Sequence, residues 1–272
     1  FALGRAALAA GRHVVIDKPL AVSLAEADAL IALAAQQQRL LSVFHNRRWD
    51  GDFLSLSQCI DSGRLGEVRE FVSRFDRFDP LPRDRWRERA APGGGLWFDL
   101  GPHLVDQALC LFGPPLTVSA DLAALRDGAE ADDYAQVVLG YAQRRVTLHC
   151  TRLAAAPGPR FEVHGTRASF VCDGFDVQEA QLRSGLAPGS RGWGEDPRPV
   201  QVTDGGSPPR PEALPRAAGD YRRYYSAVRD ALAGGGANPV TPAQARDVMA
   251  VLECAVASAR EGRRLPFVSA GR

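Results

Sequence analysis

The chain has 272 residues, and its content of 45% hydrophobic and 24% charged side chains is typical of a globular protein rather than of a disordered chain, a collagen or a coiled coil. Its 33 basic and 32 acidic side chains leave a formal net charge of +1, so the chain as a whole lacks the charge excess that favours binding to nucleic acid or anionic lipid. No apolar run approaches the roughly 20 residues of a membrane-spanning helix, so we expect a small molecule or another protein as partner and neither a membrane nor a nucleic acid.

The first part of the chain predicts an alternation of helices and strands. In order, the pattern gives a helix over 3–10, a strand over 14–16, a helix from the Ser23 and Glu26 capping box to residue 38, and a strand over 40–44. This alternation is typical of a parallel sheet with crossover helices. We therefore interpret residues 1–45 as the C-terminal remnant of a Rossmann domain, a doubly wound α/β fold that binds dinucleotides.

Residues 46–272 predict an α+β domain with a large, mostly antiparallel sheet. The expected strands cover 68–78, 117–125, 135–141, 145–153, 160–165 and 168–172, and the expected helices cover 50–63, 96–112, 219–232 and 241–262. Short turns join most of these strands, which indicates antiparallel neighbours. Six glycines and seven prolines over 185–215 predict a long loop without regular structure.

Lys18 is the only lysine of the chain, and arginine supplies every other basic side chain except histidine. It follows the strand over 14–16, and ligands of open α/β sheets bind at the carboxyl ends of strands, so we expect Lys18 to point into a cofactor crevice. Lysine can lose its proton at useful pH whereas arginine cannot, which makes Lys18 a candidate titratable amine. A solvated lysine in a strand-to-helix loop fits the same position.

A glycine run over 93–95 precedes a predicted helix that carries Asp99 and His103. Their spacing of four residues places both side chains on one side of the helix. A carboxylate beside an imidazole favours the protonated ring, so we expect His103 to exchange a proton with a substrate hydroxyl near neutral pH. The alternative is that Asp99 caps the helix and His103 packs against a neighbour.

Two further clusters are candidate binding segments. Residues 45–50 place polar donors directly after the second strand, where they form either a site between the two domains or an ordinary polar hinge. Arg85, Trp86 and Arg87 precede the glycine run. We expect them to line a substrate pocket, because a ring face and guanidinium groups suit a polyhydroxylated or anionic compound.

Two motifs resemble the glucose-fructose oxidoreductase, inositol dehydrogenase and MocA family of nicotinamide-dependent oxidoreductases. Residues 11–19 are similar to the family's Gly-Lys-His-Val-x-x-Glu-Lys-Pro, with Arg12 in place of lysine and Asp17 in place of glutamate. The family's Gly-Gly stretch followed by Asp-x-Gly-x-His-x-x-Asp is matched in order by Gly94, Gly95, Asp99, Gly101, His103 and Asp106. Segments 46–49 and 221–262 are also similar, so the resemblance covers essentially the whole chain.

The resemblance implies an NAD- or NADP-dependent dehydrogenase or reductase that acts on a CH–OH group of a sugar, a polyol or a related carbonyl compound. It implies catalytic roles for Lys18, Asp99 and His103, in which His103, assisted by Lys18, takes the hydroxyl proton and Asp99 orients His103. The implied cofactor contacts are Asp17, Lys18, Pro19, Asn46 and Arg47. The implied substrate contacts are Arg47, Asp99 and His103, to which the residue types add Trp86 and Arg87. Independently of the resemblance, we expect no metal, because the cysteines form no Cys-x-x-Cys pair and no histidine stands at metal-ligand spacing. The strands between 68 and 172 are expected to form a dimer face, so the protein is expected to be a homo-oligomer.

The front of the chain departs from the family pattern. No Gly-x-Gly-x-x-Gly follows a strand and the first residue is Phe1, so we interpret the chain as an N-terminally truncated member that on its own binds cofactor weakly or not at all. Five scattered cysteines without a Cys-x-x-Cys pair favour a reduced, cytoplasmic chain. A non-catalytic regulatory protein that binds a dinucleotide or a sugar, and an inactive fragment, remain as alternatives.

Overall fold

Residues 1–45 form a small unit around two parallel strands. The computed structural model describes residues 1–269, and its first elements are α1 (Ala2–Ala9), β1 (Val14–Asp17), α2 (Leu24–Gln36) and β2 (Leu41–Phe44). β1 pairs with β2 in parallel, and α1 packs against α2 and β1. Ser23 accepts a hydrogen bond from the N–H of Glu26, as expected of its cap. The predicted order of helix, strand, helix and strand is confirmed.

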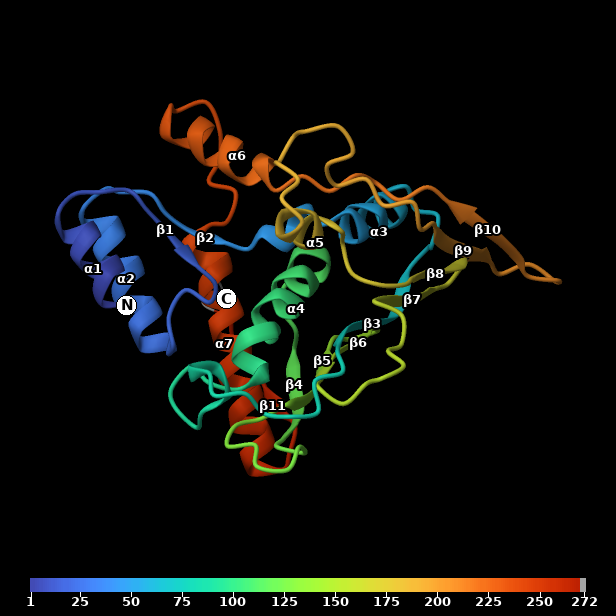
Figure 1. Ribbon diagram of the computed structural model, residues 1–272, viewed down its shortest axis with the longest axis horizontal. Coiled ribbons are helices and arrows are strands. Elements are labelled where there is room, and N and C mark those ends of the chain that lie inside the picture. Colours follow the sequence, from blue (N-terminus) through green and yellow to red (C-terminus); the bar gives the residue numbers. More distant parts are fainter. Residues whose placement is uncertain (270–272) are drawn as a thin grey trace.

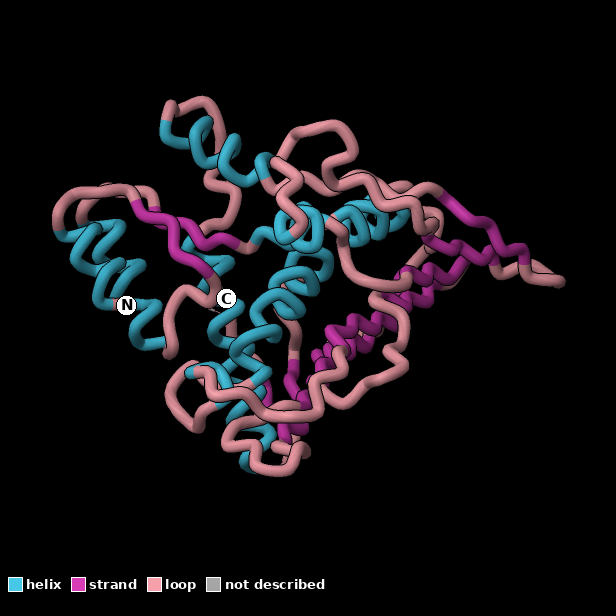
Figure 2. Tube along the Cα trace, viewed as in Figure 1, coloured by secondary structure: helices cyan, strands magenta, loops and turns pink. Residues whose placement is uncertain are grey.

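A second sheet of nine strands dominates the rest of the structure. Its order is β10-β9-β8-β7-β3-β6-β5-β4-β11. Its strands are β3 (Val68–Asp76), β4 (Thr117–Ala123), β5 (Tyr134–Gly140), β6 (Arg145–Thr151), β7 (Phe161–Gly165), β8 (Ala168–Cys172), β9 (Val200–Asp204), β10 (Arg210–Leu214) and β11 (Leu265–Pro266). All neighbours are antiparallel except β3 and β6, which run in parallel. The prediction of an α/β Rossmann remnant followed by an α+β domain with a mostly antiparallel sheet is confirmed. Figure 2 shows the two strands of the first sheet apart from the long nine-stranded one.

Helices cover one face of the large sheet. The helices of this part are α3 (Gly51–Asp61), α4 (Leu96–Phe112), α5 (Gln178–Arg183), α6 (Arg222–Leu232) and α7 (Pro242–Glu261), with short 3-10 turns at Asn46–Trp49 and Trp86–Glu88. α4 contacts β3, β5 and β6, while α7 contacts α4, β4, β2 and α2 (Figure 1). α7 therefore ties the two-stranded unit to the large sheet. No helix within residues 1–269 has the length and apolar character to cross a membrane.

The core lies between α4 and the sheet. Strand residues that alternate along β5 and β6, such as Val137 and Leu148, are fully buried, as is Phe71 on β3. α4 turns Leu104 and Ala108 toward them at helical spacing, and both side chains are fully buried. Buried residues repeat every second position along the strands and every three to four positions along the helix. This packing determines which face of α4 points away from the core.

The prediction that 185–215 lacks regular structure is wrong in its second half, which contains β9 and β10. Proline is tolerated there because β10 is the edge strand of the sheet and pairs with β9 alone. The short helix α5 and the strand β11 also lay outside the predicted elements.

The start of α4 depends on a carboxylate from another part of the chain. The carbonyl oxygen of Asp132 accepts from the N–H of Leu96 at 2.7 Å, and its Oδ2 accepts from the N–H of Trp97 at 2.7 Å. Gly95 lies just before, at φ 93°, and a Cβ there would meet Oδ1 of Asp132 at 2.0 Å. The glycine is required both by the backbone angle and by the close approach of the capping group.

We expect Gly95→Ala to lower the free energy of unfolding by about 3 kcal/mol, because it forces both the backbone and Asp132 to move. Gly128→Ala is the matched control, since Gly128 has a similar φ of 76° but no atom within 4 Å of an added Cβ. The control is expected to lose only about 1 kcal/mol. Urea denaturation of the two variants gives the comparison, and equal losses would contradict the capping role of Asp132.

Candidate active site

Lys18 joins the two parts of the structure at the carboxyl end of β1. Its ammonium donates a hydrogen bond to the backbone carbonyl of Asp99 and lies 3.3 Å from Oδ1 of the same residue. Asp99 belongs to the first turn of α4, and only 12% of the Lys18 side chain is exposed. The peptide bond to Pro19 is cis. The only lysine of the chain is therefore largely buried and bound to Asp99, and is not a solvated side chain in a loop.

Burial changes the acidity of this amine. Loss of solvation lowers the pKa of Lys18 from its usual value of 10.5, while the charge of Asp99 works in the opposite direction. The neighbouring Arg87 lowers the pKa further. Lys18 is therefore a cation that gives up its proton more easily than a lysine in water.

Asp99 is surrounded by cations and makes no hydrogen bond to His103 within the described chain. Besides Lys18, Nε of Arg87 lies 3.5 Å from Oδ1 and Nη2 of Arg152 lies 3.5 Å from Oδ2. The prediction that Asp99 orients His103 and favours its protonated form is wrong in this structure. The spacing of four residues gives the two side chains a common cavity, but the cations occupy the carboxylate.

His103 is a buried imidazole whose surroundings favour the neutral ring. Burial lowers its pKa well below 6.5, and the positive charges of Arg47 and Lys18 lower it further. Its Nδ1 has no hydrogen-bond partner among residues 1–269, and its ring centroid lies 6.2 Å from that of Phe75. A neutral imidazole with an unused nitrogen is able to accept a proton.

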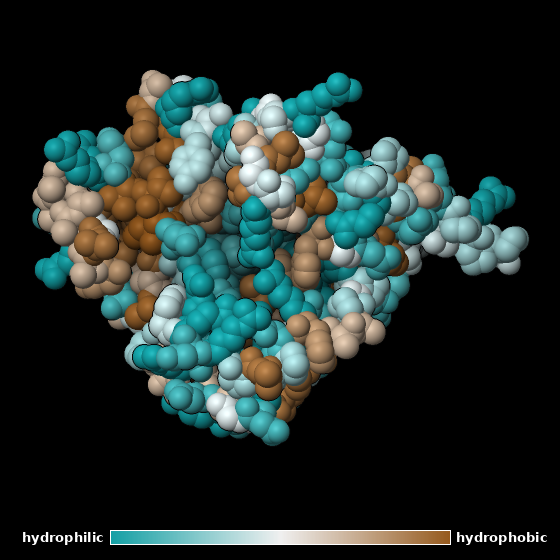
Figure 3. Space-filling view, in the orientation of Figure 1, coloured by the Kyte–Doolittle hydropathy of each residue, from teal (hydrophilic) through white to brown (hydrophobic). Residues whose placement is uncertain are grey.

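A cavity of about 630 Å³ brings these residues together. It opens where the carboxyl ends of β1 and β2 face α4 and the end of the large sheet, and hydrophilic side chains line the hollow in the middle of the face in Figure 3. The predicted site residues that line it are Asp17, Lys18, Asn46, Arg47, Arg87, Asp99 and His103. The size is in the range of cavities that hold small molecules and parts of cofactors.

Two predicted site residues lie outside the lining. Pro19 follows Lys18 but is not among the residues that border the cavity. The side chain of Trp86 is 60% exposed, and the guanidinium of Arg87 stacks on its ring at 5.0 Å. The expectation that Trp86 lines the pocket is therefore wrong here, because its neighbours Arg85 and Arg87 turn inward instead.

The cavity also includes residues that the sequence analysis missed. Arg77 and Arg152 lie directly after β3 and β6, Glu179 lies on α5, and Trp193 and Tyr221 come from the segments around it. The arginines fell inside the predicted strands 68–78 and 145–153, so neither was recognised as a residue at a strand end. Knowledge that β3 and β6 run in parallel would have revealed them, because their carboxyl ends then share one edge.

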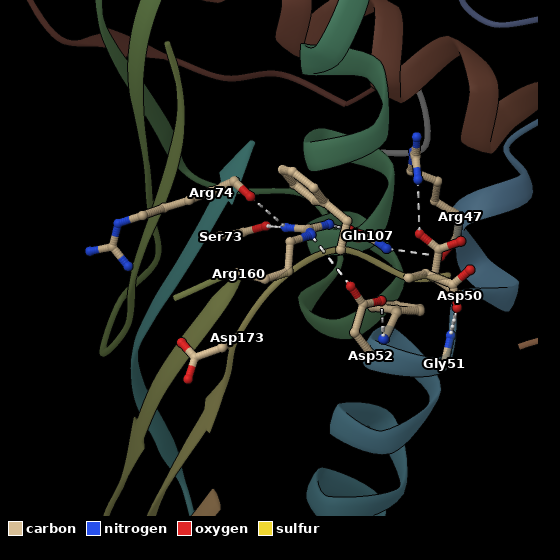
Figure 4. Close-up of polar contacts among 12 residues, drawn as sticks. Arg47, Asp50, Gly51, Asp52, Ser73, Arg74, Gln107, Arg160 and Asp173 are labelled. Atoms are coloured by element: carbon tan, nitrogen blue, oxygen red, sulfur yellow. Dashed lines mark hydrogen bonds and ion pairs between the residues drawn. The ribbon is translucent and has the colours of Figure 1, made fainter. Parts of the chain in front are cut away.

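A buried polar network supports the wall behind the cavity (Figure 4). Arg160 donates to Oε1 of Gln107 at 2.6 Å, and Nε2 of Gln107 donates to the backbone carbonyl of Arg47 at 2.8 Å. Arg160 also lies 3.6 Å from Asp52, and both side chains are almost fully buried. Arg47 itself pairs with Asp50 at 3.2 Å. The network holds the segment that carries Arg47 against α4.

Comparison with known proteins finds a family model for each of the two parts of the chain. A family model described as "Oxidoreductase family, C-terminal alpha/beta domain" matches residues 57–267, and one described as "Oxidoreductase family, NAD-binding Rossmann fold" matches residues 1–45. Both belong to the group named for glucose-fructose oxidoreductase, inositol dehydrogenase and MocA.

Three relatives illustrate the similarity. The uncharacterized oxidoreductase YdgJ of Escherichia coli is 51% identical over 96% of this chain and 75% of its own length. The scyllo-inositol 2-dehydrogenase (NADP(+)) IolW of Bacillus subtilis is 36% identical over 96% of this chain and 74% of its own length. A solved structure of the YPO2259 protein of Yersinia pestis is 46% identical with a TM-score of 0.93, over 98% of this chain and 76% of that one.

The lowered pKa of His103 predicts how stability depends on pH. Below its ordinary pKa of 6.5, the imidazole binds a proton in the unfolded chain but not in the folded one. The free energy of unfolding therefore keeps its full contribution from this group above pH 6.5. It decreases as the pH falls toward the folded-state pKa, by up to about 1.4 kcal/mol per pH unit for one such group. His45, which is also buried with a lowered pKa, adds to the same slope.

His103→Asn isolates the contribution of this one ring. Urea denaturation between about pH 7.5 and pH 5.5 should give the variant a shallower loss of stability than the parent chain. His164→Asn is the control, because the His164 side chain is 42% exposed and lies outside the cavity. Parallel pH profiles for the parent chain and His103→Asn would contradict a buried neutral His103.

Proposed function

The chain belongs to the glucose-fructose oxidoreductase, inositol dehydrogenase and MocA family of oxidoreductases, and from this premise we propose that it interconverts a hydroxyl and a carbonyl group on a sugar, a polyol or a related compound. The family uses a nicotinamide cofactor, and we leave the choice between NAD and NADP to experiment. One observation carries the proposal: Lys18, Asp99 and His103 line a single cavity at the carboxyl ends of β1 and β2.

The residues around these strand ends fit the nicotinamide end of such a cofactor. The edge of a parallel sheet is where α/β folds bind nucleotides, and the cavity there offers amide, carboxylate and cationic donors and acceptors. The unpartnered Nδ1 of His103 is a polar atom that a ligand or a water molecule would satisfy. We propose that Asp17, Lys18, Asn46 and Arg47 hold this end of the cofactor, and that Pro19 contributes by fixing the turn that carries Lys18. The bound cofactor supplies two-electron redox chemistry, which protein side chains lack.

The protein's own part in the reaction is the movement of one proton. In the direction of alcohol oxidation, neutral His103 accepts the proton of the substrate hydroxyl as the carbon is oxidised. The ammonium of Lys18 stabilises the negative charge that develops on the oxygen. Asp99 holds the ammonium at 3.3 Å from its own carboxylate, so its role is to position Lys18 rather than His103. The reverse direction uses the same groups in the opposite order.

We also propose a division of labour along the chain. Residues 1–45 contribute to the cofactor side, and residues 46–272 provide the substrate side and a contact between subunits. The large sheet supports the latter, because α4 and α7 cover one of its faces while residues such as Val138 and Val171 on alternate positions of the other face stay partly exposed. Sheet faces of this kind are common contacts in homo-oligomers.

His103→Asn should lower turnover by about 10² to 10⁴-fold, because it removes the proton acceptor while it keeps a polar side chain. Lys18→Met should lower turnover as well, and Lys18→Arg should recover part of it by restoring the charge. The measurement is the nicotinamide absorbance of the full chain with NAD⁺ or NADP⁺ and a panel of sugars, polyols and sugar acids. His164→Asn is the control.

Undiminished turnover of His103→Asn would contradict the proposed roles. If NADPH fluorescence shows binding but no compound of the panel is turned over, the regulatory alternative replaces the proposed enzyme.

A further inference from the structure

Two arginines meet at the end of the large sheet. Asp76 and Thr151 are paired residues at the ends of the parallel strands β3 and β6, and Arg77 and Arg152 are the next residues along each chain. The N–H of Arg77 donates to the carbonyl of Thr151 at 3.0 Å, so the two backbones remain side by side. Both side chains border the cavity. The parallel pairing thus delivers two guanidinium groups to the same wall.

Arg77 has no carboxylate of its own. Within residues 1–269 its guanidinium makes no hydrogen bond or ion pair, and it lies over the ring of Phe175 at 5.5 Å. Loss of solvation lowers the pKa of Arg77. The negative charge of Glu179 opposes this shift, whereas the positive charge of Arg152 adds to it. An unpaired guanidinium beside a like charge raises the free energy of the empty site, and an anion would relieve this cost.

The rest of the inner wall also carries more positive than negative charge. Arg152, Arg87 and Lys18 all contact the one carboxylate of Asp99, which can neutralise only one of them. Other cavity arginines have partners of their own, such as Arg85 with Glu88 at 2.7 Å. The excess of positive charge is therefore concentrated on Arg77, Arg152 and Arg87.

We infer that the substrate carries an anionic group, a carboxylate or a phosphate, which Arg77 and Arg152 bind at the large-sheet wall of the cavity. This inference rests on the proposed function, because it names the class of its substrate. Guanidinium groups suit planar or tetrahedral oxyanions through paired N–H donors. The hydroxyl-bearing carbon of the same molecule then lies on the side of Lys18 and His103.

The position of Asp99 supports this arrangement. Its Oδ1 faces Lys18 and its Oδ2 faces Arg152, so the carboxylate lies between the amine at the end of β1 and the guanidinium at the end of β6. The anion site therefore belongs to the side of the cavity remote from β1 and β2. A sugar acid or a sugar phosphate is long enough to reach from one side to the other, because its anionic group is several bonds from its other hydroxyl-bearing carbons.

The test compares anionic and neutral forms of one sugar by calorimetric titration of the full chain, with and without NADPH. D-glucuronate carries a carboxylate, D-glucose 6-phosphate carries a phosphate, and D-glucose carries neither. At least one of the two anions should bind about tenfold or more tightly than D-glucose, and added salt should weaken its binding. The better of the two identifies the oxyanion.

Arginine variants locate the site. Arg77→Gln and Arg152→Gln should each weaken binding of the preferred anion by about tenfold or more, and Arg77→Lys should lose less because it keeps the charge. Arg74→Gln is the matched control: Arg74 lies on β3, three residues before Arg77, but pairs with Glu162 at 3.0 Å outside the cavity. Thermal melts of the variants confirm that each one is folded.

The inference is overturned if D-glucose binds as tightly as both anions, if no probe binds, or if Arg74→Gln weakens anion binding as much as Arg77→Gln. Binding and turnover separate the two proposals. Anion binding that depends on Arg77, without turnover of any compound, would support the anion site and refute the proposed reaction. Turnover of neutral polyols alone would support the reaction and overturn the anion site.

Discussion

The contact between Lys18 and Asp99 is the interaction on which the site depends. It joins the end of a strand in the two-stranded unit to the first turn of a helix that packs on the large sheet. Each partner is fixed independently: Lys18 by the parallel pairing of β1 with β2, and Asp99 by the Asp132 cap at the start of α4. The cavity exists because these two supports face each other across it.

The same contact sets the chemical character of the cavity. Because Asp99 is occupied by Lys18, Arg87 and Arg152, it leaves His103 without an acidic partner. Burial and the surrounding cations then keep the imidazole neutral. The same cluster of cations therefore explains both features: it binds the carboxylate of Asp99, and it keeps His103 unprotonated. The polar network through Arg160 and Gln107 keeps Arg47, another of these cations, in its place.

Local patterns were sufficient for most of the fold and for part of the site. The helix over 96–112 was predicted with the bounds of α4, because its apolar period and flanking glycines are local signals. The isolated Lys18 and the pair Asp99 and His103 were found from position along the chain, and the structure brings all three to one cavity. The spacing of Asp99 and His103 cannot show which other side chains compete for the carboxylate, and the cations around Asp99 come from three separate segments.

The missed features have the same origin. Arg77 and Arg152 become neighbours only through the parallel pairing of β3 with β6, whose partners lie 75 residues apart in the register that joins Asp76 to Thr151. The hairpin of β9 and β10 forms in a segment rich in glycine and proline because β9 pairs with β8 and leaves β10 at the sheet edge, where proline is tolerated. Trp86 is the opposite kind of error. Its ring suits a sugar and its neighbours Arg85 and Arg87 border the cavity, but Trp86 itself lies outside the cavity.

A direct measurement of the Lys18 pKa tests the central contact. Because Lys18 is the only lysine, lysine labelled with ¹³C at Cε gives a single side-chain resonance in NMR spectra of the full chain. The account predicts that this resonance titrates below 10.5, and that Asp99→Asn lowers the pKa further by removal of the neighbouring negative charge. A pKa of about 10.5 that is the same in Asp99→Asn would mean that Lys18 is solvated, and would contradict the contact on which the site is built.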